Sequence, residues 1–575
     1  FAGTNAGLFA SLLFAVSLPI ILRGSIGWFK SEPLGIFYGL LGVYLFLSAL
    51  NSTNKKIIIS KIIFGGIMMA FGLSSWGGNQ FFLIPLGLFI LVLPFVRKDH
   101  KILLWSIPLF AILFILISSM FERPGLSFAT TLGGLSVIIP TLFLIGSIFI
   151  QKISKDETKL RNSFVLLILI LLFASFLLII NNETNLLDLP TFRYLNAINP
   201  FLTTQDPLTD SIAEHATTTI SQSFFFHSIL MIFSGLGIWF IFSKNTFQSK
   251  IIIKNDMKIF ILLIGITGVY VSSAFVRLEL FASISLIILT SIALSILTKE
   301  IFQINSPHKF IFKFSYVIII LTLFIIPLTF PTESNWINSM DFPPTILNGA
   351  THSPATNDWL ETLEWIKLNT PENAVIASWW DYGYWIQTMG ERASLSDNST
   401  VNDHIIKNIA KMLLSSPNDG WQMLQEMQAD YIVVFVAGQK LDAQYDNEPL
   451  YLLNGGGDES KKAWFIRIAE LPSTKYLESD NMTPTDYFWT ETLLGKMIPF
   501  KDVTYYAESI GKEADAYVPG FVPLSTKEIK FSDSINDPFK LVYASPSFYD
   551  EYYIGHMNTV LVYEINKNYD PKNNP

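Results

Sequence analysis

The sequence contains no cysteine, and charged residues make up only 15% of its 575 residues. The lack of cysteine excludes disulfide bonds, thiolate metal ligands and a cysteine nucleophile. Half of the residues are hydrophobic, which lies outside the usual composition of soluble domains. The net charge is -8 and the basic side chains form no single patch, so we expect no nucleic-acid partner. This composition indicates a membrane protein.

Apolar runs of about 20 residues, long enough to cross a bilayer, recur through the first part of the chain. We expect about 11 membrane helices from them. They cover residues 7–22, 34–50, 57–74, 80–96, 102–119, 131–151, 163–180, 223–243, 258–275, 278–298 and 311–330.

Basic residues separate the loops between these runs into two sets. Lys and Arg concentrate after the second, fourth, sixth, eighth and tenth runs and are sparse in the other loops. Because Lys and Arg in short loops stay cytoplasmic, we expect the sparse loops and the C-terminal part of the chain on the other side of the cell membrane.

The composition changes after Phe330, where the apolar runs give way to mixed polar and apolar sequence. We therefore expect a transmembrane domain over residues 1–330 and a soluble, extracytoplasmic domain over residues 331–575. Residue periodicity in the second domain predicts a mixed α/β fold. The expected helices are 357–368 and 404–414, and the expected strands are 374–378, 431–436 and 559–563.

An aromatic cluster follows the first of these expected strands, and it consists of Trp379, Trp380, Asp381, Tyr382 and Gly383. Taken alone, such a cluster is explained by an aromatic core turn whose acid caps a helix. Its pattern, however, resembles the Trp-Trp-Asp-Tyr-Gly signature of the oligosaccharyltransferase catalytic-subunit family. The resemblance implies that these residues bind the Ser or Thr hydroxyl of an Asn-x-Ser/Thr acceptor. A polar pocket left unpaired would reject an acceptor without that hydroxyl.

Residues 396–405 are similar to the second motif of this family, Asp-Asn-x-Thr-x-Asn followed by His-Ile. One residue fewer separates Asn402 from His404 than in the family pattern. The resemblance implies that Ile405 or Ile406 contacts the methyl group of an acceptor threonine. The alternative is that both are ordinary core residues.

The long loop before the eighth run resembles the external loop of the family over residues 211–226. The resemblance assigns Glu214 to the acceptor amide and places it near the metal ion. The loop at residues 23–33 resembles a metal-binding loop, with Glu32 at an acidic ligand position and Lys30 where an acid is expected. A charged lysine cannot bind a cation, so Lys30 either faces the lipid phosphate or extends to the membrane interface.

Arg277 lies in a Val-Arg-Leu element that resembles the lipid-phosphate site of the family. A guanidinium suits phosphate, and an unpaired cation at the end of a membrane helix is costly. A structural ion pair with Glu279 is the alternative for Arg277.

The resemblance implies a GT-C type polytopic membrane protein with about 11 of roughly 13 helices present. The chain begins at Phe1 without a methionine or a signal-peptide pattern, so we expect it to be cut from within a longer protein. The absent part would hold an Asp that binds Mn²⁺ or Mg²⁺ together with Glu32 and Glu214. The implied activity is transfer of an oligosaccharide from a dolichyl or polyprenyl (di)phosphate to Asn in flexible polypeptides, by a single-subunit enzyme of archaeal type.

Three other classes of protein share part of this pattern. A protein O-mannosyltransferase also uses a polyprenyl-phosphate donor, but a hydroxyl acceptor needs no pocket of the kind that the Trp379 motif indicates. A transporter predicts charged or broken helices at mid-membrane and related halves, whereas the conspicuous charges lie in loops and no halves repeat. A receptor or scaffold would leave Glu32, Glu214 and Arg277 without a role.

Overall fold

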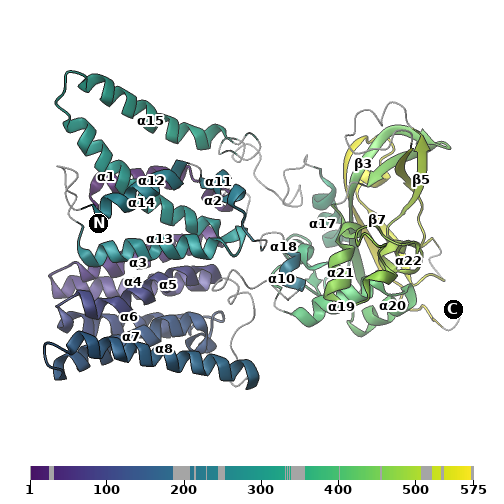
Figure 1. Ribbon diagram of the computed structural model, residues 1–575. Helices are drawn as coiled ribbons and strands as arrows, with labels where there is room; N and C mark the ends of the chain where they lie inside the picture. Colours follow the sequence, from purple (N-terminus) through teal and green to yellow (C-terminus); the bar gives the residue numbers. More distant parts are fainter. Residues whose placement is uncertain are drawn as a thin grey trace. The chain divides into compact units, whose positions relative to one another are not determined.

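The chain forms two compact units in the computed structural model, Phe1–Pro343 and Pro344–Pro575. The first is helical and the second contains helices and a sheet (Figure 1). The structure describes residues 2–24, 31–184, 207–212, 215, 217–227, 229–243, 253–330, 332, 335, 337, 356–400, 402–453, 456–506, 521–532 and 536–571. The expected fold class, a polytopic helical protein followed by a mixed α/β domain, is confirmed.

Nine helices among the described residues are long and apolar enough to cross a membrane, and they match nine of the expected spans. They are α3 (Glu32–Leu50), α4 (Lys55–Ser75), α5 (Gln80–Val96), α6 (His100–Ser118), α7 (Leu132–Ile153), α8 (Lys159–Thr184), α13 (Asn255–Ser272), α14 (Glu279–Gln303) and α15 (Lys309–Thr329).

The first expected span is broken into two shorter helices, α1 (Thr4–Ala15) and α2 (Leu18–Gly24). Pro19 explains this break, because proline lacks a backbone N–H and its ring clashes with the carbonyl four residues earlier, at Ala15. The described residues of the eighth expected span form α11 (Ile220–His227) and α12 (Ile229–Phe242). A further short helix, α10 (Pro207–Ser211), lies in the long loop before α11.

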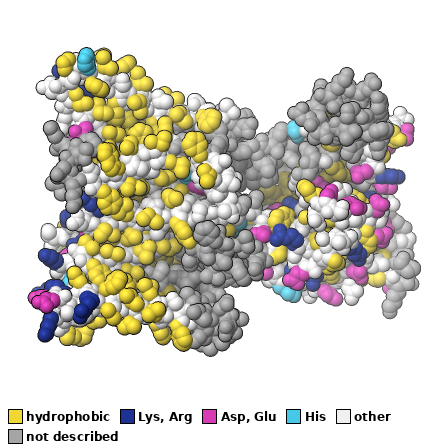
Figure 2. Space-filling view, in the orientation of Figure 1, with side chains coloured by type: hydrophobic (Ala, Val, Ile, Leu, Met, Phe, Trp, Pro, Cys, Tyr) yellow, Lys and Arg dark blue, Asp and Glu magenta, His cyan; other side chains and the backbone are white. Residues whose placement is uncertain are grey.

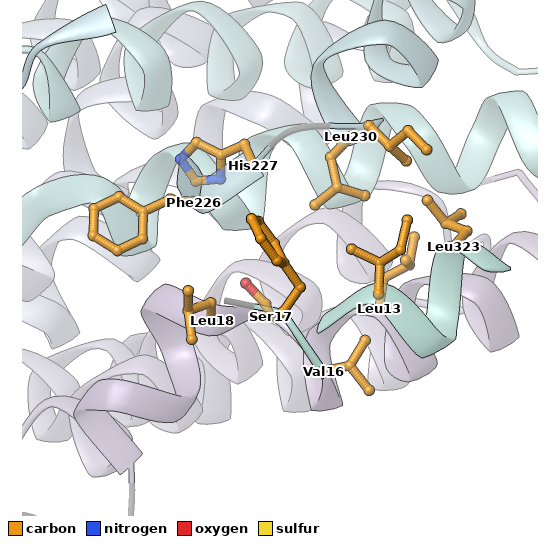
Figure 3. A pocket seen from close by; sticks show the side chains of 11 residues that line it. Leu13, Val16, Ser17, Leu18, Phe226, His227, Leu230 and Leu323 are labelled. Carbon is orange, nitrogen blue, oxygen red and sulfur yellow. The ribbon is translucent and has the colours of Figure 1, made fainter. Parts of the chain in front are cut away.

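The break between α1 and α2 lines one small cavity together with residues of α11, α12 and α15 (Figure 3). The cavity has a volume of about 50 Å³, enough for water, and Ser17 and His227 are its polar lining. The Ser17 hydroxyl is buried and has no hydrogen-bond partner among the described residues. Irregular backbone at membrane depth is tolerated where it is buried in protein or lines such a space.

α14 is the most buried of the long helices, whereas α8 and α15 are mostly exposed and lie at the two edges of the helical unit (Figure 1). α14 packs against α12 and α13. At Gly237 of α12, an added Cβ would lie 2.2 Å from the backbone oxygen of Leu289, so only glycine allows this approach. Hydrophobic side chains cover the visible face of the unit, and Lys and Arg gather along its left edge (Figure 2).

We call the end of the helical unit at which α3 begins and α13 ends the Arg277 end, because Arg277 lies between α13 and α14. At the opposite end, Arg97 joins three segments of the chain. Its guanidinium donates to Asp99 at 2.6 Å, to Asp256 at the start of α13 at 3.0 Å and to the Leu50 carbonyl of α3 at 2.8 Å. The hydrogen bond from Arg97 lowers the pKa of Asp99.

Among its described residues, the second unit contains one sheet of eight strands. The strands are β1 (Val375–Ala377), β2 (Ala393–Ser394), β3 (Tyr431–Tyr445), β4 (Glu448–Leu453), β5 (Phe500–Tyr506), β6 (Phe521–Lys527), β7 (Phe539–Ala544) and β8 (Gly555–Ile565). The longest strand, β3, pairs antiparallel with β8 and β4 and parallel with β1. The three strands expected from the sequence are therefore present as β1, β3 and β8.

Short helices accompany this sheet, and the two expected helices are α17 and α19. The helices are α17 (Asp358–Asn369), α18 (Gly383–Thr388), α19 (Asp403–Leu414), α20 (Pro417–Glu426), α21 (Lys462–Ile468), α22 (Asp486–Glu491), α23 (Leu493–Met497) and α24 (Pro546–Tyr549). α17 and α24 pack on β8, while α19 packs against α20, α21 and α23.

Replacing Arg97 with Met tests the anchor at the end opposite Arg277. The substitution leaves Asp256, which is only 6% exposed, without its cation. Because an unpaired buried charge is costly, we expect the free energy of unfolding to fall by about 3 kcal/mol. Reversible unfolding in lipid nanodiscs measures it. Lys159→Met, which removes an exposed ion pair with Asp156, should change it by less than about 0.5 kcal/mol, and equal effects would contradict the prediction.

Candidate functional site

The aromatic motif of the second unit lies where β1 ends. Residues Trp380–Tyr382 form one turn of 3-10 helix, η6, that leads directly into α18. Trp379 is buried and packs edge-on against Phe465 of α21, with 4.5 Å between ring centroids. Trp380 is half-buried, and its Nε1 donor has no hydrogen-bond partner among the described residues. Trp379 therefore belongs to the core, whereas Trp380 has an indole N–H without a hydrogen-bond partner among the described residues.

A lysine holds the acid of this motif. The Lys461 ammonium donates to Asp381 Oδ2 at 2.6 Å and to the Tyr382 hydroxyl at 2.9 Å. Tyr382 in turn donates to Asp458 Oδ1 at 2.7 Å, and Asp458 Oδ2 accepts from the Phe435 backbone N–H at 2.9 Å. The Asp381 side chain stays 33% exposed. The network fixes one carboxylate oxygen of Asp381 and leaves the group accessible to solvent.

Burial and charge act in opposite directions inside this network. Burial disfavours the charge of Lys461, but attraction to Asp381 and Asp458 outweighs it and raises the pKa of Lys461. Burial raises the pKa of Asp458, and burial next to Asp458 raises the pKa of Tyr382 far above its usual value. Lys461 therefore stays cationic at neutral pH, and Tyr382 stays a neutral hydrogen-bond donor.

The second sequence motif packs directly on the first. An added Cβ at Gly383 would lie 2.1 Å from the backbone oxygen of Ser396, so glycine is required where the two segments meet. Asn398 bridges them, because its Nδ2 donates to the Asp381 carbonyl at 2.9 Å and its Oδ1 accepts from the Tyr384 N–H at 3.3 Å. Gly383 and Tyr382 therefore belong to the packed base that supports Asp381.

The two isoleucines expected to contact the acceptor differ in burial. Ile406 is 1% exposed and belongs to the core of the unit, whereas Ile405 is half-buried at the start of α19. The side chain of Asn402 caps this helix by accepting from the Ile405 N–H at 3.3 Å. Of the two candidates, Ile405 is the one that a ligand can reach without opening the core.

In the helical unit, Glu32 and Arg277 meet although 245 residues separate them in sequence. Glu32 begins α3 and is fully buried, and its Oε1 accepts from Arg277 Nη2 at 2.7 Å. The Arg277 side chain is 27% exposed. The proposed metal-ligand acid and the proposed phosphate-binding cation therefore lie in one ion pair at the Arg277 end.

The neighbouring acid Glu279, at the start of α14, has other partners. Its Oε1 accepts from the Ser223 hydroxyl at 2.7 Å, and its Oε2 lies 2.5 Å from His227 Nε2. The loop before α11 is also held at the turn between α13 and α14. There Thr218 donates to the Ser272 carbonyl at 2.8 Å, and the ring of His215 lies 5.0 Å from that of Phe275.

Two predicted site residues, Lys30 and Glu214, lie outside the described residues. No group of three acidic or histidine side chains that could hold a metal ion occurs within the part of the chain that the structure describes. The Oε2 oxygen of Glu32 is buried and unpaired among the described residues, so it fits one ligand of a hard cation. Further ligands would have to come from residues such as Glu214.

No sequence motif pointed to Lys461, Asp458 or the His227 partner of Glu279. The spacing of Asp458 and Lys461 places both on one turn, η7 (Asp458–Lys461), after a glycine run. That signal is weak, because it lies about 80 residues from the motif it supports. A histidine and a glutamate within apolar runs are a stronger signal, since such residues are costly in a membrane.

Sequence and structure comparisons place this geometry among known proteins. No protein-family model matches the chain. It is 26% identical over 500 residues to the STT3 subunit of the dolichyl-diphosphooligosaccharide–protein glycosyltransferase of Dictyostelium discoideum, covering 84% of this chain and 66% of that protein. The STT3B subunit of Oryza sativa subsp. japonica is 26% identical over 502 residues, covering 81% and 66%. The homologues of this chain are STT3 oligosaccharyltransferase subunits.

The solved structures most relevant to this homology share the fold of both units. The apo oligosaccharyltransferase of Archaeoglobus fulgidus aligns with a TM-score of 0.62 at 14% identity, covering 88% of this chain and 66% of that one. AglB of the same organism, in complex with an inhibitory peptide and a dolichol-phosphate, aligns with a TM-score of 0.61 at 13% identity, with the same coverage. The chain spans just under two thirds of the length of these STT3 and AglB relatives.

Glu459 adjoins the Asp381 network on the side of Asp458. It is 6% exposed, and neither carboxylate oxygen has a hydrogen-bond partner among the described residues. Burial raises the pKa of Glu459 from 4.5 to about 7. The folded state therefore binds a proton that the unfolded chain releases between these two pH values.

Raising the pH through this window should destabilise the second unit. The pKa of Glu459 is higher in the folded state than in the unfolded chain. The contribution of this residue to stability is therefore fully present below pH 4.5 and is lost as the pH rises to about 7. We expect the free energy of unfolding of the second unit to fall by about 3 kcal/mol over this pH range because of Glu459, and we expect Glu459→Gln to remove this fall. The cysteine-free chain allows the measurement, by denaturant-dependent thiol labelling of a cysteine introduced at buried Ala410. Glu372→Gln, at an exposed position, should leave the pH dependence unchanged.

Proposed function

We propose that the chain is the catalytic part of an oligosaccharyltransferase that transfers a glycan from a dolichyl or polyprenyl (di)phosphate to Asn in Asn-x-Ser/Thr. The hydrogen-bonding state of two adjacent residues carries the proposal. Trp380 Nε1 is a buried donor without a partner among the described residues, and Lys461 uses only Oδ2 of Asp381, which leaves Oδ1 for another donor. A hydroxyl group accepts one hydrogen bond and donates one, so it satisfies both groups.

This pairing explains how an acceptor would be selected. A Ser or Thr hydroxyl pairs with both Trp380 and Asp381, whereas Ala at that position leaves both groups unpaired. Lys461 keeps the Asp381 carboxylate in place at 2.6 Å. Ile405, half-buried at the start of α19, is suited to the methyl group of Thr. The acceptors are flexible polypeptides, because the sequon has to enter the pocket in an extended form.

Residues at the Arg277 end serve the lipid-linked donor. Arg277 provides a partly exposed guanidinium, the group best suited to bind a phosphate through two hydrogen bonds. Mn²⁺ or Mg²⁺, held by Glu32 Oε2 together with Glu214, would neutralise charge on the departing phosphate. Lys30 is a further candidate for contact with the phosphate.

The acceptor amide needs activation, since its nitrogen lone pair is delocalised into the carbonyl group. Glu214 would accept a hydrogen bond from the amide and weaken this conjugation. The nitrogen then attacks the C1 carbon of the sugar, the bond from C1 to the phosphate oxygen breaks, and the amide proton passes to a carboxylate. The charge pattern of the loops supports an extracytoplasmic location for this chemistry and for the second unit. We propose that one polypeptide suffices for it, although the STT3 relatives are named as subunits.

Glycan transfer to an Asn-x-Thr peptide tests the function. The assay uses the full chain in membranes that contain lipid-linked glycan and Mn²⁺. We expect Asp381→Ala and Lys461→Met to raise KM for the peptide about tenfold or more. The first substitution removes the carboxylate that accepts from the acceptor hydroxyl, and the second removes the ammonium group that holds this carboxylate in place. Glu214→Ala should lower kcat instead, because it acts on the amide rather than on binding.

Two controls make this assay decisive. Lys367→Met removes an exposed ion pair with Glu391 of the same unit and should leave both constants unchanged. A peptide with Gln in place of Asn should receive no glycan. Undiminished transfer by both Asp381→Ala and Glu214→Ala would refute the assigned roles, and glycan found on a Ser or Thr hydroxyl would favour an O-glycosyltransferase.

A further inference from the structure

Glu279 is a buried acid that the proposed chemistry does not use. It is 2% exposed and lies two residues after Arg277, as the first residue of α14. Its two oxygens bind Ser223 and His227, four residues apart on α11. Residues four apart lie on one face of a helix, so a single carboxylate holds two successive turns of α11.

We propose that Glu279, with His227 and Ser223, is a positioning clamp that fixes the external loop against the turn between α13 and α14 for glycan transfer. The proposal rests on the proposed function, because it concerns the loop that contains Glu214. α11 follows that loop directly. The contacts that position α11 therefore also position the point at which the loop joins the helical unit.

The clamp connects the loop to the donor site through the backbone of the same turn. Arg277 and Glu279 are separated by one residue, and Arg277 binds Glu32 at the start of α3. The Glu279 carboxylate thus holds α11 from one side of this turn while Arg277 holds α3 from the other. A shift of α11 would move the loop relative to Glu32 and Arg277, and misplacement of about 1 Å can cost a large factor in rate.

The residue types in the clamp indicate that it fixes the position of α11 and does more than stabilise the fold. His227 is buried like Glu279, and its Nδ1 lies 3.4 Å from the Ser283 hydroxyl of α14. Every polar atom of the imidazole ring is thereby paired. Apolar residues at such buried sites often stabilise a protein as well as an ion pair does, so an acid and a histidine here are better explained by positional specificity. The position of Glu279 at the N-terminus of α14 also favours a negative charge.

Paired spin labels measure the position of α11 without any assay of activity. The cysteine-free chain accepts labels at Ser221→Cys on α11 and Val269→Cys on α13, both exposed. Electron–electron distance measurements in nanodiscs should give a narrow distribution for the parent chain. We expect Glu279→Gln and His227→Phe to broaden or shift it, and to lower kcat for transfer about tenfold or more with KM for the peptide unchanged.

A double variant separates positioning from folding. Glu279→Leu with His227→Phe removes both buried polar groups, so it should keep the unfolding midpoint of the parent chain while losing the narrow distribution and the kcat. The matched control is Thr290→Val, which removes a 3.1 Å hydrogen bond from α14 to the Leu230 carbonyl of α12 and should leave the label distances unchanged.

The outcomes distinguish the clamp from the proposed function. Unchanged label distances in the Glu279 and His227 variants would overturn the clamp, whatever the activity. Unchanged kcat in variants whose distances have shifted would overturn its role in transfer. Altered distances in a chain whose parent form transfers no glycan would support the clamp and refute the proposed function.

Discussion

A carboxylate buried at the end of a helix in an apolar bundle is costly unless it is paired, and α3 and α14 both begin with one. Glu32 is paired by Arg277, and Glu279 by Ser223 and His227. Because these partners come from segments far apart in sequence, satisfying the two acids brings together α3, α11 and the turn between α13 and α14. The arrangement of the Arg277 end follows from this requirement.

In the second unit, one lysine offsets the cost of burying acidic side chains. Lys461 lies among Asp381, Asp458 and Tyr382, and its cation offsets the cost of placing the acids close together. Asp458 and Tyr382 are buried, so their part of the network is structural, whereas Asp381 stays partly exposed. The rigid part of the network thus orients the one carboxylate that a ligand can reach.

Much of this architecture could be predicted from the sequence, because it follows from local pattern. The long apolar runs predicted nine helices in the places where they occur, and strands such as β1 and β8 follow from short apolar runs. The break between α1 and α2 could also be predicted, from Pro19. The ion pair of Glu32 with Arg277 could not be predicted, since periodicity specifies that each residue lies at a helix end but not which helix ends meet. The same holds for Lys461 and Asp381.

The division of polar groups between the units also bears on how specificity and rate are separated. Asp381, proposed to recognise the acceptor hydroxyl, is bound by Asn398 and Lys461 of the second unit. Arg277 and Glu32, proposed to serve the phosphate and the metal ion, bind each other inside the helical unit. Because these two sets share no residue, the proposed function allows acceptor recognition and donor binding to be altered by separate substitutions.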